Sequence, residues 1–581
     1  MGKTNMEKIK QYLTQNKISA TIFLILTTIT TIITYFLVSI QSQIGVYYWD
    51  IFFYLNNALK MAGIGVGDTL YLSPFLPLVT SLFFRAGLVH ESTLFVISGV
   101  FYLLGTLGLY LLLNLRFKPW ESLAGALSFA TFTVVIIWAA SGALDVPAIS
   151  VSIWALYLTL LAVKKDSRFY YLAFPVAMLA FLTRFTSGLI LLPMLLVIFM
   201  NLYGNDFKKT VPGIDGNVIQ KIKVIILAND FKNMVIGIII GILTYLPFMW
   251  YFNRQVGNLF PFLDQFSGSA SGAVSSSNPG FSLDTLYYLK HIPEYISSWA
   301  VPNYQKLLWP SESNATILAY VLLGVIIVGI IIYLTKIINK IIKKDKPRLF
   351  HLKLLITIIM GLVLVLTYSN ISYALSEILL LLFSASVYLL LKDINLKYLD
   401  MDILFFTWFA AFLIMHSAHP VKVDRYFITM APPLAYGITL GINKISSILK
   451  YKYKDINLTS VLISSVLVIS MILSATAYIG AIPTVDPQVQ SEKAAAEWLI
   501  DYDPDYDNKT IAADRGPAFS WYLKKYVFTR INFKTSSEVL NDKKVEINQD
   551  YYIHVHSENP LNLEGYYIIK RIDSVIIYQK R

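Results

Sequence analysis

The chain has 581 residues, of which 56% are hydrophobic and only 14% are charged, and its mean hydropathy is +0.58. This composition excludes an ordinary water-soluble globular protein and indicates an integral membrane protein, because so much apolar surface cannot be hidden in a soluble core. The net charge of +12 comes mostly from basic loops beside the apolar runs, which suits an anionic inner leaflet and gives no support for a nucleic-acid partner.

Apolar runs of about 17 to 25 residues, long enough for a helix to cross the hydrocarbon layer, recur along the chain. We predict about thirteen membrane-spanning helices from them. The two runs on either side of Arg184 would also fit one long bent helix, but a charge at that depth favours two short spans that meet at the outer surface. The predicted spans are residues 18–40, 92–114, 120–141, 146–163, 169–184, 186–203, 233–252, 315–335, 350–368, 373–391, 402–418, 427–447 and 457–480.

The loop charges predict how the chain is oriented in the membrane. Short cytoplasmic loops carry an excess of Lys and Arg. Such residues gather before the first span and then in alternate loops, at 3–17, 116–118, 164–168, 208–223, 336–348, 392–397 and 450–454. We therefore expect a multi-pass protein of the cell membrane with a cytoplasmic N-terminus and an extracytoplasmic C-terminus.

The chain divides into two parts by hydrophobicity. Residues 1–483 form the predicted transmembrane domain, with two long outer loops at 41–91 and 253–314. Hydrophobicity falls from residue 484 onward, and short helical and strand patterns alternate as in a soluble protein. The fold class expected is thus a polytopic α-helical membrane protein with a small extracytoplasmic α/β domain at 484–581.

Asp50 is the first candidate catalytic residue. It follows the first span in an aromatic stretch that includes Tyr48 and Tyr54. Aromatic rings of this kind settle at headgroup depth, where a partly desolvated carboxylate could act as a general base on a lipid-borne substrate. The alternative is a solvated loop residue with no chemical role.

Asp145 is the second candidate acid, in a short break between two predicted spans. By the predicted topology it emerges on the same side of the membrane as Asp50, so the two acids could share one site. The alternative role is capping of the helix that follows, and a capping carboxylate can also position a substrate hydroxyl or a metal.

Basic residues on the same predicted side could bind an anion. Arg184 lies within an apolar region, where an ionisable residue is a functional candidate by default, although structural pairing with Asp145 would also explain it. Lys422 and Arg425 break the charge rule because their loop is predicted to be outside. Guanidinium binds phosphate bidentately, so a lipid phosphate fits; lipid anchoring without catalysis is the alternative.

A metal site and an ATP site have weaker support. His416 and His419 are three residues apart and could face one side of a helix, but no third ligand lies nearby in the sequence. No cofactor is certain from the sequence, and the question of a divalent metal stays open. No phosphate-binding P-loop or serine nucleophile elbow is present, which removes the main support for ATP-driven transport.

These motifs, taken in order, resemble the GT-C superfamily of membrane glycosyltransferases. The resemblance is to the dolichyl-phosphate-mannose protein mannosyltransferases and the lipid A aminoarabinose transferases. The matching features are Asp50 after the first span, Tyr71-Leu-Ser-Pro-Phe-Leu-Pro77 before the second, Asp145 at the fourth, Asn253 with Gly257-Asn258-Leu-Phe-Pro261, and Asp424-Arg-Tyr426 followed by Pro432-Pro433.

The resemblance implies a transferase of a GT-C fold that takes a sugar from a polyprenyl- or dolichyl-phosphate donor and passes it to an acceptor at the outer membrane face. We expect an inverting reaction in which Asp50 is the base and Asp145 orients an acceptor, sugar or metal. The donor phosphate would meet Arg184, Arg425 and Lys422. The expected substrate pocket comprises Tyr48, Tyr54, Asn258, His419 and Tyr426.

The acceptor and two rival functions stay open. Many protein mannosyltransferases have Asp-Glu in the first loop, whereas this chain has Asp50-Ile51, so a glycan, lipid or protein acceptor remains to be distinguished. A ligase or polymerase would use a lipid-diphosphate donor and transfer a whole glycan. A lipid-linked sugar flippase would bind the donor without consuming it.

Overall fold

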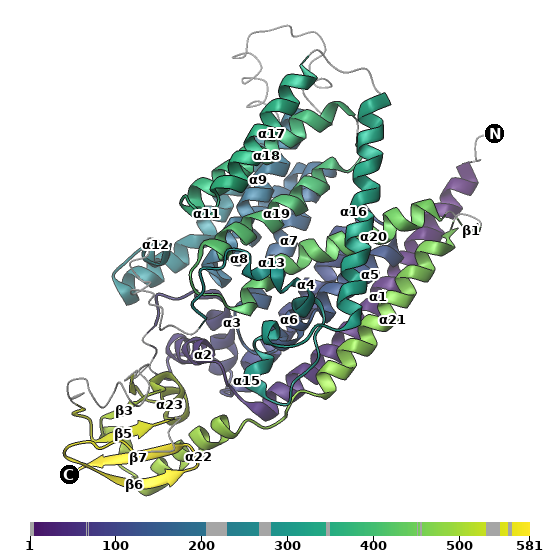
Figure 1. Ribbon diagram of the computed structural model, residues 1–581. Helices are drawn as coiled ribbons and strands as arrows, with labels where there is room; N and C mark the ends of the chain where they lie inside the picture. Colours follow the sequence, from purple (N-terminus) through teal and green to yellow (C-terminus); the bar gives the residue numbers. More distant parts are fainter. Residues whose placement is uncertain are drawn as a thin grey trace.

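The computed structural model describes residues 5–65, 67, 69–204, 229–266, 280–343, 349–394, 396–449, 451–453, 456–529, 547–555 and 560–581. Long helices form one bundle, and a small sheet lies at one end of it (Figure 1). The predicted fold class, a polytopic helical protein with a small C-terminal α/β part, is confirmed.

Ten helical segments of the described chain are long and apolar enough to cross a membrane, which confirms a multi-pass membrane protein. They are α1 (Asn5–Ile44) from Lys17 onward, α4 (Glu91–Asn114), α7 (Asp145–Lys164), η2 (Phe185–Ile190) with α9 (Leu191–Gly204), α11 (Asn229–Val256), α16 (Ile317–Lys343), α17 (Phe350–Thr367), α18 (Tyr373–Leu391), α19 (Leu399–Ala418) and α21 (Leu458–Gly480). The pair α5 (Pro119–Thr131) and α6 (Thr133–Ala139), bent by 63°, would make an eleventh.

The predicted total of thirteen spans is not confirmed, because two predicted spans form different elements. Residues 169–184 yield only the 14-residue α8 (Tyr170–Thr183), which ends where Arg184 adopts an extended backbone. The run 427–447 is divided into a 3-10 helix, η5 (Asp424–Met430), and α20 (Ala431–Ile448). Two prolines in the first turn of α20 explain its start, since proline suits that position and lacks the amide hydrogen needed further inside a helix.

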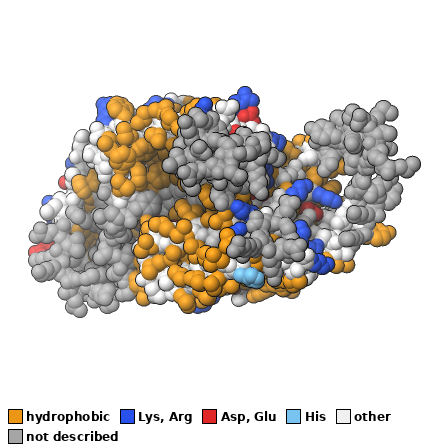
Figure 2. Space-filling view, turned by 90° about the horizontal axis from the view of Figure 1, so that it is seen from above, with side chains coloured by type: hydrophobic (Ala, Val, Ile, Leu, Met, Phe, Trp, Pro, Cys, Tyr) orange, Lys and Arg blue, Asp and Glu red, His pale blue; other side chains and the backbone are white. Residues whose placement is uncertain are grey.

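The described surface of the bundle is apolar over broad areas and carries basic side chains at the end opposite the sheet (Figure 2). Seen from the end opposite the sheet, the described surface combines broad hydrophobic areas with exposed Lys and Arg side chains (Figure 2). Lys340 and Lys343 lie in the last turn of α16, beside exposed apolar side chains such as Ile331 and Ile338. The exposed apolar belt is the surface expected to meet lipid, while the orientation of the bundle in the membrane stays a prediction.

Short elements cover the end of the bundle that faces the sheet. They are α2 (Trp49–Ala62), α3 (Phe75–Arg85), α12 (Pro261–Phe266), α13 (Tyr287–Lys290), α14 (Ile292–Ile296), α15 (Tyr304–Leu307) and η3 (Pro310–Glu312). Two further 3-10 turns, η1 (Ser167–Phe169) and η4 (Lys392–Ile394), and the strands β1 (Lys452–Tyr453) and β2 (Ile456–Asn457) join helices elsewhere. The amphipathic α2 buries Phe52 and Leu55 completely and stops at Gly63, whose φ of +79° favours glycine.

The C-terminal part is a mixed sheet with helices. Its elements are α22 (Pro487–Tyr502), η6 (Tyr506–Asn508), β3 (Ile511–Ala513), α23 (Gly516–Leu523), β4 (Phe528–Thr529), β5 (Tyr551–His554), β6 (Tyr566–Ile572) and β7 (Val575–Lys580). The strand order is β4-β3-β5-β7-β6, with β4, β3 and β5 parallel and β7 antiparallel to both its neighbours. Ile511, Ile553 and Ile577 are fully buried between the sheet and its helices.

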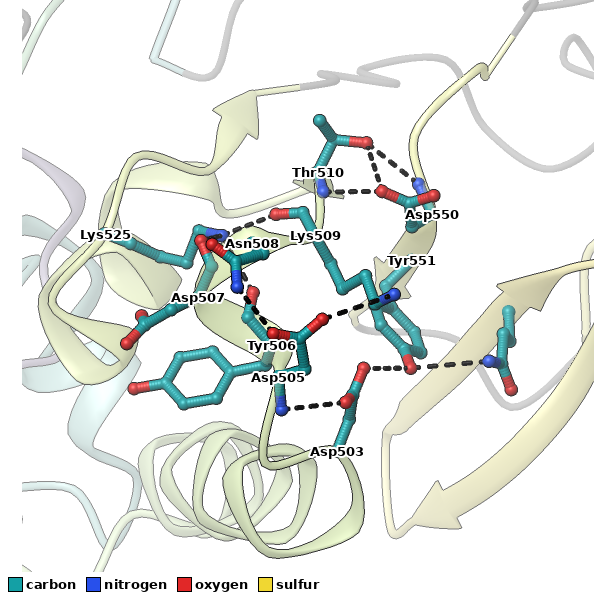
Figure 3. Close-up of polar contacts among 11 residues, drawn as sticks. Asp503, Asp505, Tyr506, Asp507, Asn508, Lys509, Thr510, Lys525, Asp550 and Tyr551 are labelled. Carbon is teal, nitrogen blue, oxygen red and sulfur yellow. Dashed lines mark hydrogen bonds and ion pairs between the residues drawn. The ribbon is translucent and has the colours of Figure 1, made fainter.

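Lysine and acidic side chains hold the loop between α22 and β3 in place (Figure 3). The Lys525 ammonium donates hydrogen bonds to the backbone carbonyls of Tyr506 and Asp507, each at 2.9 Å, and also to that of Lys509. The positive charge of Lys525 therefore lies among the backbone carbonyl oxygens of this acidic loop.

Replacing Lys525 with methionine is expected to destabilise this loop by about 2 kcal/mol, because three carbonyls lose a charged donor. Limited proteolysis of the full-length protein, followed at the C-terminal part, measures the effect. Lys509→Met is the matched control, since that ammonium is exposed and lies 3.7 Å from Asp505 Oδ2. Equal protease sensitivity of the two variants would contradict the assigned role of Lys525.

Candidate active site

Asp50 lies in the first turn of α2, at the end of the bundle that faces the C-terminal sheet. The chain leaves α1 at Ile44 and turns at Gly45, whose φ is +85°. The Asp50 side chain is 33% exposed, and its Oδ2 lies 2.5 Å from Arg425 Nη2. The proposed base is therefore accessible and held by a guanidinium group.

Asp145 is the first residue of α7 and only 2% exposed. Its Oδ1 forms an ion pair with Arg184 Nη1, and its Oδ2 lies 3.7 Å from Arg425 Nη1. Gly142, with a φ of +89°, makes the turn that precedes it. Arg425 thus bridges the two acids, which come from segments 95 positions apart in the chain.

Aromatic rings enclose the two guanidinium groups. The Arg184 guanidinium lies 4.8 Å from the centre of the Tyr426 ring. Arg425 lies 4.6 Å from the Tyr48 ring and 5.5 Å from the Trp138 ring. Cation–π contacts of this kind hold a guanidinium in place while leaving its edges free to bind anions.

The local charges keep Arg425 protonated despite its burial. Burial alone would lower the pKa of Arg425, but the negative charge of the Asp50 carboxylate opposes burial, and the pKa of Arg425 lies well above its ordinary value. The group is therefore a permanent cation whose own side chain is largely shielded from water. A cation in such a place is suited to a phosphate anion.

The other predicted pocket residues lie in different surroundings. Tyr54 follows Asp50 by one turn of α2 and is buried. The ring of His419, at the C-terminal end of α19, lies 6.2 Å from that of Tyr426. Asn258 follows α11, and its Oδ1 accepts a hydrogen bond from the amide of Phe260 at 2.9 Å, which closes a local turn.

Lys422 does not join this ion cluster. Its ammonium donates hydrogen bonds to the carbonyls of His416, Ser417 and His419, at 3.2, 2.8 and 2.6 Å, and so caps the C-terminal end of α19. Burial lowers its pKa to about 8, opposed by the negative charge of Asp284. The structure thus gives Lys422 a local structural contact rather than a place beside Asp50.

His416 and His419 do not face a common position for a metal ion. His416 Nε2 lies 3.1 Å from Thr429 Oγ1, whereas His419 Nδ1 lies 2.9 Å from the carbonyl oxygen of Val421. Within the described ranges, no three His, Asp or Glu side chains are placed to hold a metal ion.

Asp424, next to Arg425, is a site residue to which the sequence reasoning gave no role of its own. It is fully buried, and burial raises its pKa. Its carboxylate accepts hydrogen bonds from Tyr287 and Tyr295 hydroxyls at 2.9 and 3.0 Å, and from the Ser311 amide at 2.8 Å. These contacts tie the Arg425 segment to the region between α12 and α16 that carries Tyr287, Tyr295 and Ser311.

Replacing Asp424 with alanine is expected to lower the free energy of unfolding by about 2 to 4 kcal/mol, because the buried Tyr295 and the half-buried Tyr287 and Ser311 lose their hydrogen-bond acceptor. Sugar transfer should fall together with stability. Thermal unfolding of the purified protein measures the first effect. Asp284→Ala is the control, since Asp284 is a surface partner of Lys290; an equal loss in both variants would refute the role given to Asp424.

The C-terminal part contacts the segment that carries Asp50. Arg515 Nη1 lies 2.7 Å from Glu492 Oε1, and its Nη2 donates a hydrogen bond to the carbonyl of Tyr47 at 2.7 Å. The Asn56 amide donates a hydrogen bond to the Pro517 carbonyl at 2.8 Å. The two ends of the Asp50 segment are thus both fixed by the C-terminal part.

Comparisons with known proteins agree with this architecture. Residues 72–225 match the family model of dolichyl-phosphate-mannose-protein mannosyltransferases, a range that includes Asp145 and Arg184. No curated protein matches the chain by sequence.

Solved structures of ArnT from Cupriavidus metallidurans are similar over almost the whole chain. The structure bound to undecaprenyl phosphate has 10% sequence identity and a TM-score of 0.55, covering 96% of this chain and 97% of that one. The apo structure has 12% identity and a TM-score of 0.54, covering 96% and 98%. The likeness shows a shared fold, and together with the family model it confirms the resemblance predicted from the motifs.

Proposed function

We propose that the protein is a glycosyltransferase that moves a sugar from a polyprenyl- or dolichyl-phosphate donor to an acceptor at the outer face of the membrane. The observation that carries this proposal is the bridging of Asp50 and Asp145 by Arg425, with Arg184 on the buried side. One accessible acid beside two largely buried cations suits the transfer of a group from a phosphate. The matching family model and the undecaprenyl phosphate bound to ArnT support the choice of donor.

The reaction is an inverting single displacement. The acceptor hydroxyl oxygen attacks the anomeric carbon, and its proton passes to the Asp50 carboxylate. The bond between that carbon and the phosphate oxygen breaks, and polyprenyl phosphate leaves with the electron pair. The leaving group is an anion of low basicity, so the reaction needs cations to stabilise it rather than an acid to protonate it.

The other residues of the site support the Asp50 base and the leaving phosphate. Arg184 and Arg425 stabilise the charge that develops on the phosphate, and Asp145 holds both guanidinium groups in position. Tyr48 and Tyr426 form the aromatic walls against which the sugar can lie. Lys422 contributes only through the position of its loop, because its ammonium is already hydrogen-bonded to the carbonyls at the end of α19.

The orientation of the protein in the membrane is part of the same proposal. The basic loops place the N-terminus in the cytoplasm, so the end of the bundle that carries Asp50 and the C-terminal sheet faces outward. A glycan, lipid or protein acceptor would then reach Asp50 from the extracytoplasmic side.

Offering two labelled donors side by side to the purified protein tests the proposal. We expect the sugar of a polyprenyl-monophosphate donor to be transferred to extracted membrane acceptors and the corresponding diphosphate donor to stay intact. Consumption of the diphosphate donor alone would indicate the ligase or polymerase. Transport of an intact monophosphate donor across a sealed vesicle, with no transfer, would indicate the flippase.

A further inference from the structure

We infer that the donor phosphate itself frees the base, by displacing the Asp50 carboxylate from Arg425. This inference rests on the proposed function and adds an order of events to it. In the structure, Arg425 Nη2 is 2.5 Å from Asp50 Oδ2. While Asp50 Oδ2 accepts this hydrogen bond from Arg425, that oxygen is not available to take the proton of the acceptor hydroxyl. The base has to leave Arg425 before it can act.

The charges around Arg425 are balanced before a donor arrives. Asp50 and Asp145 contribute two negative charges, and Arg184 and Arg425 contribute two positive ones. A phosphate that joins this set makes it negative, in surroundings where burial strengthens every repulsion. The repulsion is relieved if one carboxylate moves away into water.

Asp50 is the carboxylate that can move. Its side chain is 33% exposed, whereas that of Asp145 is 2% exposed and also holds Arg184. Separating a buried acid from its partners leaves an unpaired charge out of water, which is strongly unfavourable. Asp50 needs only to turn toward the open side of the site.

Arg425 has an unused donor for the incoming phosphate. Its Nε is buried and has no hydrogen-bond partner. Nε and Nη2 form one edge of the planar guanidinium, and Asp50 engages that edge through Nη2 alone. A phosphate can bind both nitrogens of an edge in parallel, which is the stronger arrangement. The geometry therefore favours exchange of Asp50 for phosphate at this edge.

The exchange of Asp50 for phosphate on Arg425 sets the order of the reaction steps. With the site empty, Asp50 is paired and an acceptor hydroxyl keeps its proton. When the phosphate binds, Asp50 is released beside the sugar that the same phosphate carries. The acceptor is activated only when a donor is in place.

Equilibrium binding of undecaprenyl phosphate to the full-length protein in nanodiscs tests this order, with wild type, Asp50→Asn and Asp145→Asn compared. We expect Asp50→Asn to bind the lipid about tenfold more tightly, because the competing carboxylate is gone. Asp145→Asn should bind it more weakly, because both guanidinium groups lose their support. A melting temperature for each variant shows that it is folded.

The alternative explanations predict different results in this binding experiment. Equal tightening in both variants would mean a simple charge effect and would overturn the exchange, as would unchanged or weaker binding in Asp50→Asn. Those outcomes leave the proposed function standing if Asp50→Asn still loses transfer. If the wild-type protein does not bind undecaprenyl phosphate, both the proposed donor and the proposed exchange are wrong.

Discussion

Replacing Asp50 with asparagine is expected to lower the rate of sugar transfer about 10²- to 10⁴-fold, the range in which a general base contributes. Asparagine keeps the size of the side chain and can still contact Arg425, but it cannot accept the proton of the acceptor hydroxyl. The fold should be unaffected, because the Asp50 side chain is partly exposed and asparagine has nearly the same shape. The measurement is the rate of product formation at saturating donor.

The control for this prediction is Asp501→Asn, which makes the same chemical change at an exposed acid of α22. That variant should transfer sugar at the wild-type rate. If Asp50→Asn also transferred at the wild-type rate, Asp50 would not be the base, and the gathering of charges around Arg425 would need another explanation.

Replacing Arg425 with glutamine should have the second large effect, with kcat/KM for the donor falling about 10²- to 10³-fold. The developing charge on the phosphate loses its stabilising cation, and Asp50 and Asp145 lose the group that bridges them. Lysine at this position should restore only part of the activity, because an ammonium lacks the planar edge that binds phosphate through two nitrogens.

Arg116→Gln separates a loss of fold from a loss of donor binding. Arg116 is another buried guanidinium, paired with Asp402 beyond the end of α4 that lies away from the site. Its replacement should lower the melting temperature without a specific effect on the donor. If both glutamine variants lowered kcat/KM in proportion to their loss of stability, the phosphate-binding role of Arg425 would be wrong.

The charged site could be predicted because its two arginines break a local rule and its two acids lie at span ends on one predicted side. Arg184 is a charge inside an apolar region, Arg425 is basic in a loop predicted to be outside, and Asp50 and Asp145 follow or precede spans on one predicted side. The structural pairing of Arg184 with Asp145, weighed as an alternative to a functional role, is present. Pairing and function are compatible here because Arg425 connects that pair to Asp50.

Other long-range contacts of the site could not be predicted from the sequence. Trp138 lies in an apolar run and gives no sign that its ring will cover Arg425. Lys422 has the same local signal as Arg425, yet its ammonium turns back to the end of α19, which only the tertiary structure decides. The hydrogen bond from Arg515 to Tyr47 joins residues far apart in the chain, and nothing in either segment indicates it.

The predicted number of spans is not confirmed over the described residues, for a related reason. Hydrophobicity shows that a segment avoids water, but it does not show whether the helix is long enough to cross the membrane. The run before Arg184 forms a helix of only 14 residues, and the run after Arg425 begins as a 3-10 helix before α20 starts. Both departures are next to the site, where the backbone positions a guanidinium group.

The most direct test of the account follows the fate of a polyprenyl-phosphate donor whose sugar and lipid carry different labels, in liposomes that contain the purified protein and membrane acceptors. The account predicts that the sugar label passes to the acceptor and that free polyprenyl phosphate accumulates in equal amount. A donor that stays intact, whether it remains in place or crosses the bilayer, would contradict it.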